Sequence, residues 1–459
     1  MNDDIEILDI FDKKDVDNKV EIKKEEIIDQ PKKKVVKKKL KTRALQLAFC
    51  IISGLFILGC IIFYGARFIK YYRIYNPKLD GGPVLLGNQI AFGDNSTSTE
   101  GESGLYSANG GFVFRGKIDR NYLQYNNMLW RVVRINEDRS IDVILDDYIN
   151  ILPWNSEVSE FTKSEIYDYL NNDFLNQLDK SLLVEGTICN EMVDDIKGKT
   201  CDHENIVKTY VSFLSVSDFL GATIDSKNYL VDDEEIFWLR DYSSDKIWHT
   251  NGSNVSRSDS NVFYEVRPVV RLSKEIHYTK GNGTIDNPYI VDKSDTLSIG
   301  SIVNLDNDKW IVYDKSDNVK LMHYELLNDK KIFDKKKLNY DESSLKEYLN
   351  TTYLDSLSYK DKIIDSEWYI GSYENKLSDI KKSKTTAKVG LPNMLDIKFD
   401  SEIKEYFTST SNADERIWVY TNPLRPSRIT SERNIRPCIT ISKEYANKLV
   451  YRDGMFVEE

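Results

Sequence analysis

The chain has 459 residues, of which 41% are hydrophobic and 12% aromatic, and its formal net charge is -11 at pH 7. This length and apolar content suffice for two packed domains and exclude a chain that is disordered throughout. The negative charge disfavours nucleic acid as a partner, because binding to phosphates requires a clustered positive surface.

Residues 1–44 are predicted to be a disordered cytoplasmic tail. Residues 1–30 are rich in Asp, Glu and Lys and poor in aromatic residues, a composition that does not form a packed core. Residues 32–43 (KKKVVKKKLKTR) contain eight basic residues and no acidic one. Next to an apolar segment, such a run fixes membrane topology and contacts anionic headgroups.

The uncharged stretch LQLAFCIISGLFILGCIIFY predicts a transmembrane helix over residues 45–66. At about 1.5 Å of rise per residue, twenty residues cover the roughly 30 Å hydrocarbon core of a bilayer. A buried core helix would be shorter and amphipathic, and a cleaved signal peptide would not follow more than forty polar residues. Basic residues are more numerous before the stretch than after it. The expected localisation is therefore the cell membrane, single-pass, with a cytoplasmic N-terminus and extracytoplasmic C-terminal modules.

The outer part of the chain is predicted to contain two α+β modules. A linker rich in Gly, Ser and Asn occupies residues 67–111. The modules are assigned to residues 112–280 and 298–445. Residues 281–297 form the link between them, and residues 446–459 form a C-terminal tail.

Five sequence blocks occur twice in the same order, which indicates a duplication. The pairs are MLWRVVRI with DKWIVYD, two helices that carry Tyr-Leu-Asn, VSFLSVSDFLGA with AKVGLPNMLDI, IFWLRDY with RIWVYTN, and EVRPVVRLSKE with NIRPCITISKE. In this alignment Trp130 corresponds to Trp310 and Trp238 to Trp418, whereas Trp248 has no counterpart. Each repeated helix is predicted to begin at a capping box, the first at Thr162-x-x-Glu165 and the second at Ser344-x-x-Glu347.

The cysteines of the outer chain lie in two places. Cys189 and Cys201 share one polar loop, and a disulfide between them is predicted on the oxidising side of the membrane. The alternative is a zinc site with His203, although the spacing matches no common zinc motif and a fourth ligand is missing. Cys438 lies in an apolar run and is expected in the core of a strand.

The candidate ligand-binding residues are Trp248, Arg240 and Arg257. Trp248 belongs to WHTNGSNVSRSDSN, a polar stretch interpreted as a long loop. Exposed aromatic side chains beside Arg are typical of binding hot spots, and packing in the core is the alternative. The two Arg-Pro pairs, at residues 267–268 and 436–437, are interpreted as structural. Pro is expected at the edge or start of a strand, and Arg is expected to pair with a buried carboxylate.

Other chemistry is not apparent in the sequence. The four His are scattered, and the sequence contains neither a Gly-x-Ser-x-Gly motif nor a phosphate-binding Gly loop. No catalytic residue, metal site or cofactor is predicted.

The run FVFRGKIDRNYLQYNNMLWRVVRINEDRS resembles the opening of a domain of unknown function in surface-anchored bacterial proteins. The YLN-bearing helix, the WLR segment, VRPVV and the GNGTIDNPY link continue the resemblance, which covers residues 104–444 and is closer in the first copy. It implies a module similar to the C-type-lectin-like and formylglycine-generating-enzyme-like group, and hence a fold of one transmembrane helix followed by two tandem C-type-lectin-like α+β modules. The calcium-binding tripeptides of sugar-binding lectins are absent, and Cys438 alone cannot supply the reactive Cys pair of the oxidases.

Taken with the duplication, these features predict a membrane-anchored binding or adhesion protein whose modules recognise a surface protein or a glycan, since repetition increases avidity. A membrane-anchored enzyme acting on cell-envelope material and a structural envelope component are the alternatives. The sequence predicts neither the ligand, nor a need for calcium, nor the oligomeric state.

Overall fold

The computed structural model describes most of the chain after the N-terminal tail. The described ranges are residues 34–75, 85–154, 159–194, 202–231, 235–291, 296–399, 405–421 and 424–459. The chain divides into two compact units, residues 1–71 and residues 72–459. Most of the predicted cytoplasmic tail, residues 1–33, lies outside the described residues.

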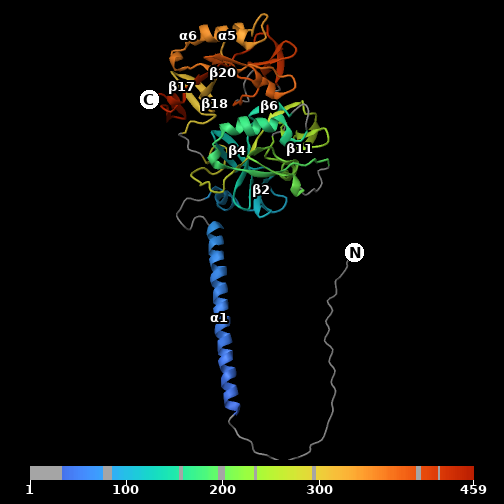
Figure 1. Ribbon diagram of the computed structural model, residues 1–459, viewed down its shortest axis with the longest axis vertical. Helices are drawn as coiled ribbons and strands as arrows, with labels where there is room; N and C mark the ends of the chain where they lie inside the picture. The colour runs from blue at the N-terminus through green and yellow to red at the C-terminus, as the bar shows by residue number, and fades with distance from the viewer. Residues whose placement is uncertain are drawn as a thin grey trace, which may run out of the picture. The chain divides into compact units, whose positions relative to one another are not determined.

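The first unit contains all but the last turn of helix α1 (Lys34–Tyr75) (Figure 1). This helix begins within the basic run, so that residues 34–44 of the predicted tail are helical. Its segment Leu45–Gly65 is long and apolar enough to cross a membrane, and none of it is buried within the structure. Large side chains such as Phe49 and Phe56 are more than 70% exposed. Such a surface requires cover by lipid or by another protein.

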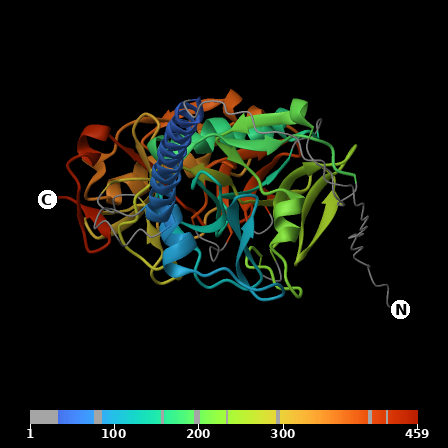
Figure 2. The ribbon, with the colours of Figure 1, turned by 90° about the horizontal axis from the view of Figure 1, so that it is seen from below.

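The second unit consists mostly of β-sheet with short helices, which confirms a mixed α+β fold (Figures 1 and 2). Two of its sheets, with nine and seven strands, share an order of six strands. In the first sheet the order is β16 (Tyr289–Ile290), β3 (Tyr122–Tyr125), β4 (Met128–Ile135), β5 (Ile141–Leu145), β15 (Val269–Leu272) and β10 (Val211–Ser212). In the second sheet it is β28 (Met455–Val457), β17 (Ile302–Leu305), β18 (Asp308–Asp314), β19 (Val319–His323), β26 (Cys438–Ile441) and β22 (Val389–Gly390). The parallel pair comes first in both, β16 with β3 and β28 with β17.

Local sequence explains the hairpins that begin both sheets. The two-residue turn between β3 and β4 contains Asn126 and Asn127, and that between β17 and β18 contains Asp306 and Asn307. All four residues have φ between 52° and 68°. Asn and Asp tolerate this left-handed region better than other residues with a side chain, and the turn matches the twist of the strands.

A bulge also recurs at the same position. The register between β4 and β5 shifts between Val132 and Arg134, and the register between β18 and β19 shifts between Val312 and Asp314. The bulged residues are 180 positions apart in the sequence. A bulge redirects the side chain beside it, and Arg134 and Asp314 therefore occupy equivalent places in the two sheets.

The segments assigned to linkers contribute to the sheets. Strand β16 comes from the predicted link, and β27 (Val450–Arg452) and β28 come from the predicted tail, after α7 (Lys443–Ala446). The predicted linker before the first module includes α2 (Leu86–Asn88), η2 (Gln89–Asp94) and β1 (Gly104–Ala108), and β1 pairs with β2 (Gly111–Arg115). Each sheet is thus completed by residues outside the predicted module boundaries.

The repeated Tyr-Leu-Asn segment lies in a broken helix in both copies. The first comprises α3 (Glu165–Asp168), η4 (Tyr169–Phe174) and η5 (Leu175–Gln177), and the second comprises α5 (Ser344–Tyr348), η9 (Leu349–Tyr353) and α6 (Leu354–Ser356). The N-caps are Ser164 and Ser343, which corrects the predicted Thr162 and Ser344. Thr162 lies instead within the 3-10 turn η3 (Phe161–Lys163), whereas an N-cap residue has an extended backbone, as Ser164 does.

A small three-stranded sheet accompanies each large sheet. These sheets are β11 (Trp238–Tyr242), β12 (Ile247–Asn251) and β13 (Asn254–Ser258), and β23 (Tyr406–Asn412), β24 (Arg416–Tyr420) and β25 (Arg425–Arg428). The central strands β12 and β24 carry Trp248 and Trp418, and both precede an Arg-Pro pair by a similar distance, 19 and 18 residues. Trp248 therefore corresponds to Trp418. Trp238 pairs with His249, the residue after Trp248, and Phe407 pairs with Val419, the residue after Trp418. Trp238 therefore corresponds to Phe407.

Short two-stranded sheets and turns complete the unit. They are β14 (Phe263–Val266) with β6 (Asn150–Pro153), β8 (Gly186–Cys189) with β9 (Ile206–Thr209), β20 (Ser366–Tyr369) with β21 (Lys384–Ala387), strand β7 (Leu183–Val184), helix α4 (Val216–Gly221), and the turns η6 (Lys180–Leu182), η7 (His203–Asn205), η8 (Tyr340–Glu342), η10 (Lys360–Lys362) and η11 (Leu377–Lys382).

Candidate functional site

Trp248 is a core residue. Its side chain is 5% exposed and belongs to a cluster with Phe219, Phe237 and Leu239. The indole Nε1 donates a hydrogen bond to the Val193 carbonyl at 2.9 Å. The polar stretch around Trp248 forms the β12–β13 hairpin and not the long loop that the sequence suggested. Trp248 therefore lacks the exposed ring that motivated its choice as a binding residue.

The two arginines of the predicted cluster lie in different environments. The Arg257 guanidinium stacks on the Trp248 ring, 4.8 Å from its centroid. Arg240 donates from Nη1 to the Phe213 carbonyl at 3.2 Å and lies 3.9 Å from a carboxylate oxygen of Asp218. The structure thus places Arg257 beside Trp248, whereas Arg240 belongs to a cavity described below.

The predicted cysteine positions are partly described. Cys438 is fully buried in β26, as expected for the core of a strand. The free cysteines among the described residues are Cys50, Cys60 and Cys438. Cys201 lies outside the described residues, so that its disulfide with Cys189 stays a prediction. Within the described ranges, no group of three or more His, Cys, Asp or Glu residues could hold a metal ion.

The Arg-Pro pairs are structural, but the two arginines bind different partners. Arg267 is 2% exposed and lies 3.2 Å from a carboxylate oxygen of Glu235, as expected. Arg436 is fully buried and donates to the carbonyl of His323 at 2.9 Å. The carboxylate partner expected for Arg436 is therefore replaced by a backbone carbonyl. Both prolines stand directly before a strand, β15 or β26.

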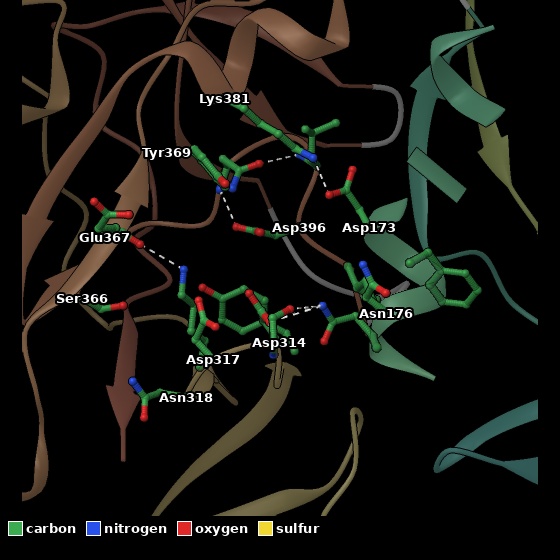
Figure 3. Close-up of a pocket in the computed structure, with 18 of the residues that line it drawn as sticks. Asp173, Asn176, Asp314, Asp317, Asn318, Ser366, Glu367, Tyr369, Lys381 and Asp396 are labelled. Atoms are coloured by element: carbon green, nitrogen blue, oxygen red, sulfur yellow. Dashed lines mark hydrogen bonds and ion pairs between the residues drawn. The ribbon is translucent and has the colours of Figure 1, made fainter. Parts of the chain in front are cut away.

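A polar cavity of about 390 Å³ lies beside the second large sheet. Its floor includes Asp314 at the end of β18 and Lys320 in β19, and Asp396 comes from the loop after β22. The first module contributes Asp173 and Asn176 from its broken helix (Figure 3). The cavity is therefore composite, because residues of both modules line it.

A second cavity, of about 320 Å³, occupies the equivalent place in the first module. Arg134 at the bulge lies across from Asp142, as Asp314 lies across from Lys320. The strands β8 and β20 line the two cavities at corresponding positions. We call the cavity of the first module cavity A and that of the second module cavity B.

In cavity A every lining carboxylate is paired with a guanidinium group. Arg134 lies 2.8 Å from Asp218, and Arg271 binds both carboxylate oxygens of Asp142 at 2.6 and 3.0 Å. Burial alone would raise the pKa of Asp218, but Arg240 and Arg134 outweigh it and lower that pKa. Each carboxylate of these pairs is thus held in its charged form by a guanidinium.

Cavity B has an excess of carboxylates. Six carboxylates and three ammonium groups line it, and they belong to Asp173, Asp314, Asp317, Asp365, Glu367, Asp396, Lys320, Lys381 and Lys384. Lys381 pairs with Asp173, and Lys384 lies 2.9 Å from Glu367. Burial raises the pKa of Asp396, and the opposing attraction of Lys398 and Lys320 does not cancel this rise. The inner carboxylates are therefore less well compensated than those of cavity A.

Cavity B also contains a buried hydroxyl without a partner. Tyr169 is 3% exposed and lines the cavity, and its hydroxyl makes no hydrogen bond within the described structure. The neighbouring Asn150 amide is already engaged, because its Nδ2 donates to the carbonyls of Met394 at 2.7 Å and Asp396 at 3.2 Å. An unpaired buried hydroxyl is costly unless a ligand or water completes it.

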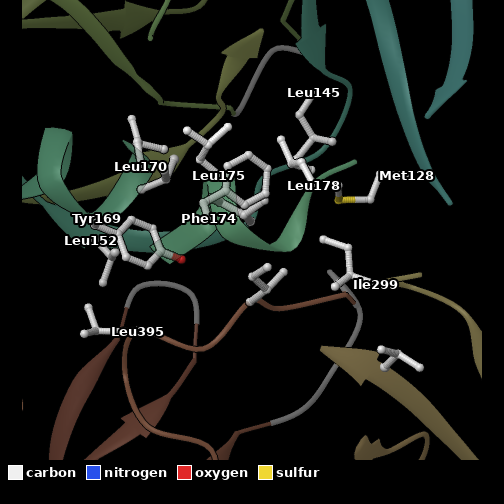
Figure 4. Packing of buried hydrophobic residues seen from close by; sticks show 14 of the residues in the cluster. Met128, Leu145, Leu152, Tyr169, Leu170, Phe174, Leu175, Leu178, Ile299 and Leu395 are labelled. Atoms are coloured by element: carbon white, nitrogen blue, oxygen red, sulfur yellow. The ribbon is translucent and has the colours of Figure 1, made fainter. Parts of the chain in front are cut away.

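Direct contacts between the modules hold cavity B in place. The Lys398 N–H donates to the Ile149 carbonyl at 2.8 Å, next to the bonds from Asn150. Glu165 accepts from the Leu377 N–H at 2.6 Å and from the Ser378 hydroxyl at 2.7 Å. Apolar packing adds to these bonds, since Phe174 and Leu395 lie in one continuous core (Figure 4). The helix of the first module and the Asp396 loop are therefore fixed relative to each other.

Sequence reasoning did not identify either cavity. The available signal was the exchange of Arg134 for Asp314 at aligned positions, together with the recurrence of an aspartate at Asp218 and Asp396 in the third repeated block. Only the strand pairing shows that these residues line equivalent cavities. Neither a family model, nor a curated protein, nor a solved structure matches the chain.

Proposed function

We propose that this chain is a membrane-anchored, extracytoplasmic binding protein whose ligand occupies cavity B. The proposal rests on one observation: the charged side chains of the two equivalent cavities are paired to different extents. Cavity A is occupied by ion pairs between Arg and Asp, whereas cavity B keeps an excess of carboxylates over ammonium groups and a buried hydroxyl without a hydrogen-bond partner in the described structure. Polar groups that converge on a concave site without internal partners are typical of ligand binding.

The location follows from α1 and the charges around it. The exposed apolar segment Leu45–Gly65 would be covered by lipid. The basic run before it would stay in the cytoplasm, which puts both cavities outside the cell. The strand order shared by the two large sheets supports two tandem modules. Their C-type-lectin-like character is part of the proposal, and a fold by itself carries no activity.

The ligand class is a surface protein or a glycan. The side-chain amides of Asn172, Asn176 and Gln177 and the rings of Tyr169 and Tyr369 line cavity B, and the Gln177 amide bonds to Asp314, Ser316 and Lys315. Amides and carboxylates bind hydroxyl or peptide groups in defined directions, and rings cover apolar faces. Both ligand classes offer such groups.

A binding screen with the full chain in lipid nanodiscs tests the proposal. Glycans, cell-wall fragments and surface proteins would be applied to the native chain and to variants of Asp314 and Asp396 (each Asp→Asn). We expect saturable binding of at least one ligand, weakened tenfold or more by either variant. Asp414→Asn removes the same charge at an exposed turn outside the cavity and should bind normally. Binding that is equal in all four proteins would contradict the assignment of the site.

A further inference from the structure

We infer that cavity B binds an organic ammonium group, such as the end of a lysine side chain in a peptide or a small free amine. The inference rests on the proposed function and names the chemistry that the ligand must carry. The carboxylates of Asp314 and Asp396 would hold the ammonium group, and the first module would help to position it.

The charge balance of the cavity favours a cation. Within the described structure, Asp314, Asp317, Asp365 and Asp396 form no ion pair, although all four line the cavity. Asp317 and Asp365 are exposed, so that water screens them and their attraction is weak. Asp314 and Asp396 are half-buried and are better placed to attract a positive charge.

The inner carboxylates keep free acceptor capacity. One oxygen of Asp314 accepts from the Gln177 side chain at 3.2 Å and from the Ser316 N–H at 2.8 Å. One oxygen of Asp396 accepts from the Asn393 N–H at 2.8 Å. An ionised carboxylate offers about four acceptor sites, and an ammonium group supplies three donors that can share them.

The buried Tyr169 hydroxyl is an independent indication of a ligand. It lines cavity B, it is nearly inaccessible to solvent, and it has no hydrogen-bond partner in the described structure. A hydroxyl oxygen can accept from an ammonium group. A bound amine would thus donate a hydrogen bond to the Tyr169 hydroxyl and also reduce the excess of negative charge in the cavity.

The lysines already present in cavity B show that the cavity is compatible with such pairs. Lys381 of the second module reaches Asp173 of the first, and Lys384 reaches Glu367. Both lysine side chains are about one-third or more exposed (34% and 44%), so that they lie toward the rim. The third lysine of the cavity, Lys320, lies across from Asp314 and attracts Asp396. Its ammonium group donates to the Glu367 carbonyl at 3.0 Å and forms no ion pair with either inner carboxylate in the described structure. No three carboxylates of the described residues are arranged to hold a metal ion, which favours a cation that needs fewer ligands.

The contrast with cavity A predicts selectivity. At the bulge, cavity A has Arg134 where cavity B has Asp314. An ammonium group that binds beside Asp314 would be repelled by a guanidinium at the same place. The amine should therefore bind one cavity of the pair and occupy a single site per chain.

Calorimetric titration of the full chain in nanodiscs tests the inference with defined probes. The probes are Nα-acetyl-lysine methylamide, its uncharged analogue Nα-acetyl-norleucine methylamide, and 1,5-diaminopentane. We expect one site per chain for the lysine probe, at least tenfold weaker binding of the norleucine probe, and weaker binding at high salt. If 1,5-diaminopentane binds as well as the lysine probe, a free amine is the ligand, whereas preference for the lysine probe indicates a peptide.

Matched variants place the bound amine. Asp314→Asn and Asp396→Asn keep the shape of the side chain and should each weaken the lysine probe at least tenfold. Tyr169→Phe should weaken it severalfold, and Asp414→Asn should have no effect. Thermal unfolding of each variant verifies that it is folded. The rim variant Asp317→Asn should weaken binding of the lysine probe less than the inner variants do, because Asp317 is exposed and water screens its charge.

The outcomes separate this inference from the proposed function. Equal binding of the lysine and norleucine probes, or no effect of the inner variants, would overturn the ammonium site. If neither probe binds while a neutral or anionic ligand binds and depends on Asp396, the proposed function holds and the ammonium inference is wrong. If nothing binds to the folded chain in either experiment, both fail.

Discussion

Among single residues, Glu265 has the most unusual carboxyl group of the first module. It lies in β14, its Oε2 atom is buried, and that atom has no hydrogen-bond partner in the described structure. Burial raises the pKa of Glu265 to about 8, repulsion from Glu235 adds to the rise, and Arg267 opposes it. The carboxyl is therefore mostly protonated at neutral pH.

This raised pKa predicts a dependence of stability on pH. The pKa of Glu265 is higher in the folded chain than the ordinary value of 4.5, so that the folded state binds the proton more tightly. The resulting stabilisation is present below pH 4.5 and is lost as the pH rises toward 8. Glu265→Gln does not titrate. Between about pH 5 and pH 9, we expect this variant to gain on the order of 4 kcal/mol of stability relative to the native chain, because each unit of pKa difference corresponds to about 1.4 kcal/mol.

Urea unfolding of the native and variant chains at about pH 5 and pH 9 measures this difference. Glu275→Gln, which removes an exposed carboxyl, serves as the control and should change little between the two values of pH. A Glu265→Gln variant that follows the native pH dependence would show that the carboxyl is ionised throughout.

At the scale of elements, an asparagine joins the broken helix to the sheet in both modules. The Asn171 amide donates to the Val211 carbonyl at 2.9 Å and accepts from the Val211 N–H at 3.1 Å. The Asn350 amide makes the same two bonds to Val389, at 2.8 and 3.0 Å. These bonds satisfy the backbone groups of the short edge strands β10 and β22, which explains why Tyr-Leu-Asn is repeated.

Removing either asparagine should destabilise its own module. Asn171→Ala and Asn350→Ala each leave one N–H of an edge strand without its partner, at a cost of about 2 kcal/mol. The carbonyl loses the amide donor but still accepts from the hydroxyl of Thr209 or Tyr340. Thermal unfolding of the two variants measures the loss. Asn172→Ala, at the exposed neighbouring position, is the matched control and should cost less than about 0.5 kcal/mol. Equal stability of Asn171→Ala and Asn172→Ala would contradict the role of the bonds.

The sequence predicts those features of the elements that are visible within a short segment, and it does not predict which distant segments pair. The duplication was evident because core positions such as Trp130 and Trp310 recur with their flanking residues. The pairing of Trp238 with Trp418 was wrong, because both lie in similar short runs and only the strand order distinguishes them. Trp248 was assigned to a loop for the same reason, since the polar residues around it belong to a hairpin that the local sequence alone does not distinguish from a loop.

For the whole molecule, the sequence did not reveal that the two modules share a core. Helical periodicity identifies which residues of a segment are buried, but it does not say against which segment they pack. The structure places Phe174, in the broken helix of the first module, in a core that also includes Leu395 of the other module. Cavity B arises from this packing, which is why no reading of either module alone could have found it.

Asn150 connects the two modules without lining cavity B. Its side chain is fully buried and donates to the carbonyls of Met394 and Asp396. In Asn150→Ala these carbonyls lose their donor and the Asp396 loop loses its support. We expect the chain to lose about 2 to 3 kcal/mol of stability. We also expect cavity B to bind its ligand several times more weakly, because the loop must then be ordered on binding.

Two measurements on Asn150→Ala separate these effects. Thermal unfolding reports the loss of stability, and titration with the lysine probe well below the unfolding temperature reports the affinity of the folded chain. Asn190→Ala is the matched control, because Asn190 is a partly buried asparagine whose amide bonds to Glu160 and Thr162 of the first module. It should lower stability without changing the affinity. If Asn150→Ala likewise lowers only the stability, the first module supports the fold of the second but does not tune its cavity, and contact between the modules would serve stability alone.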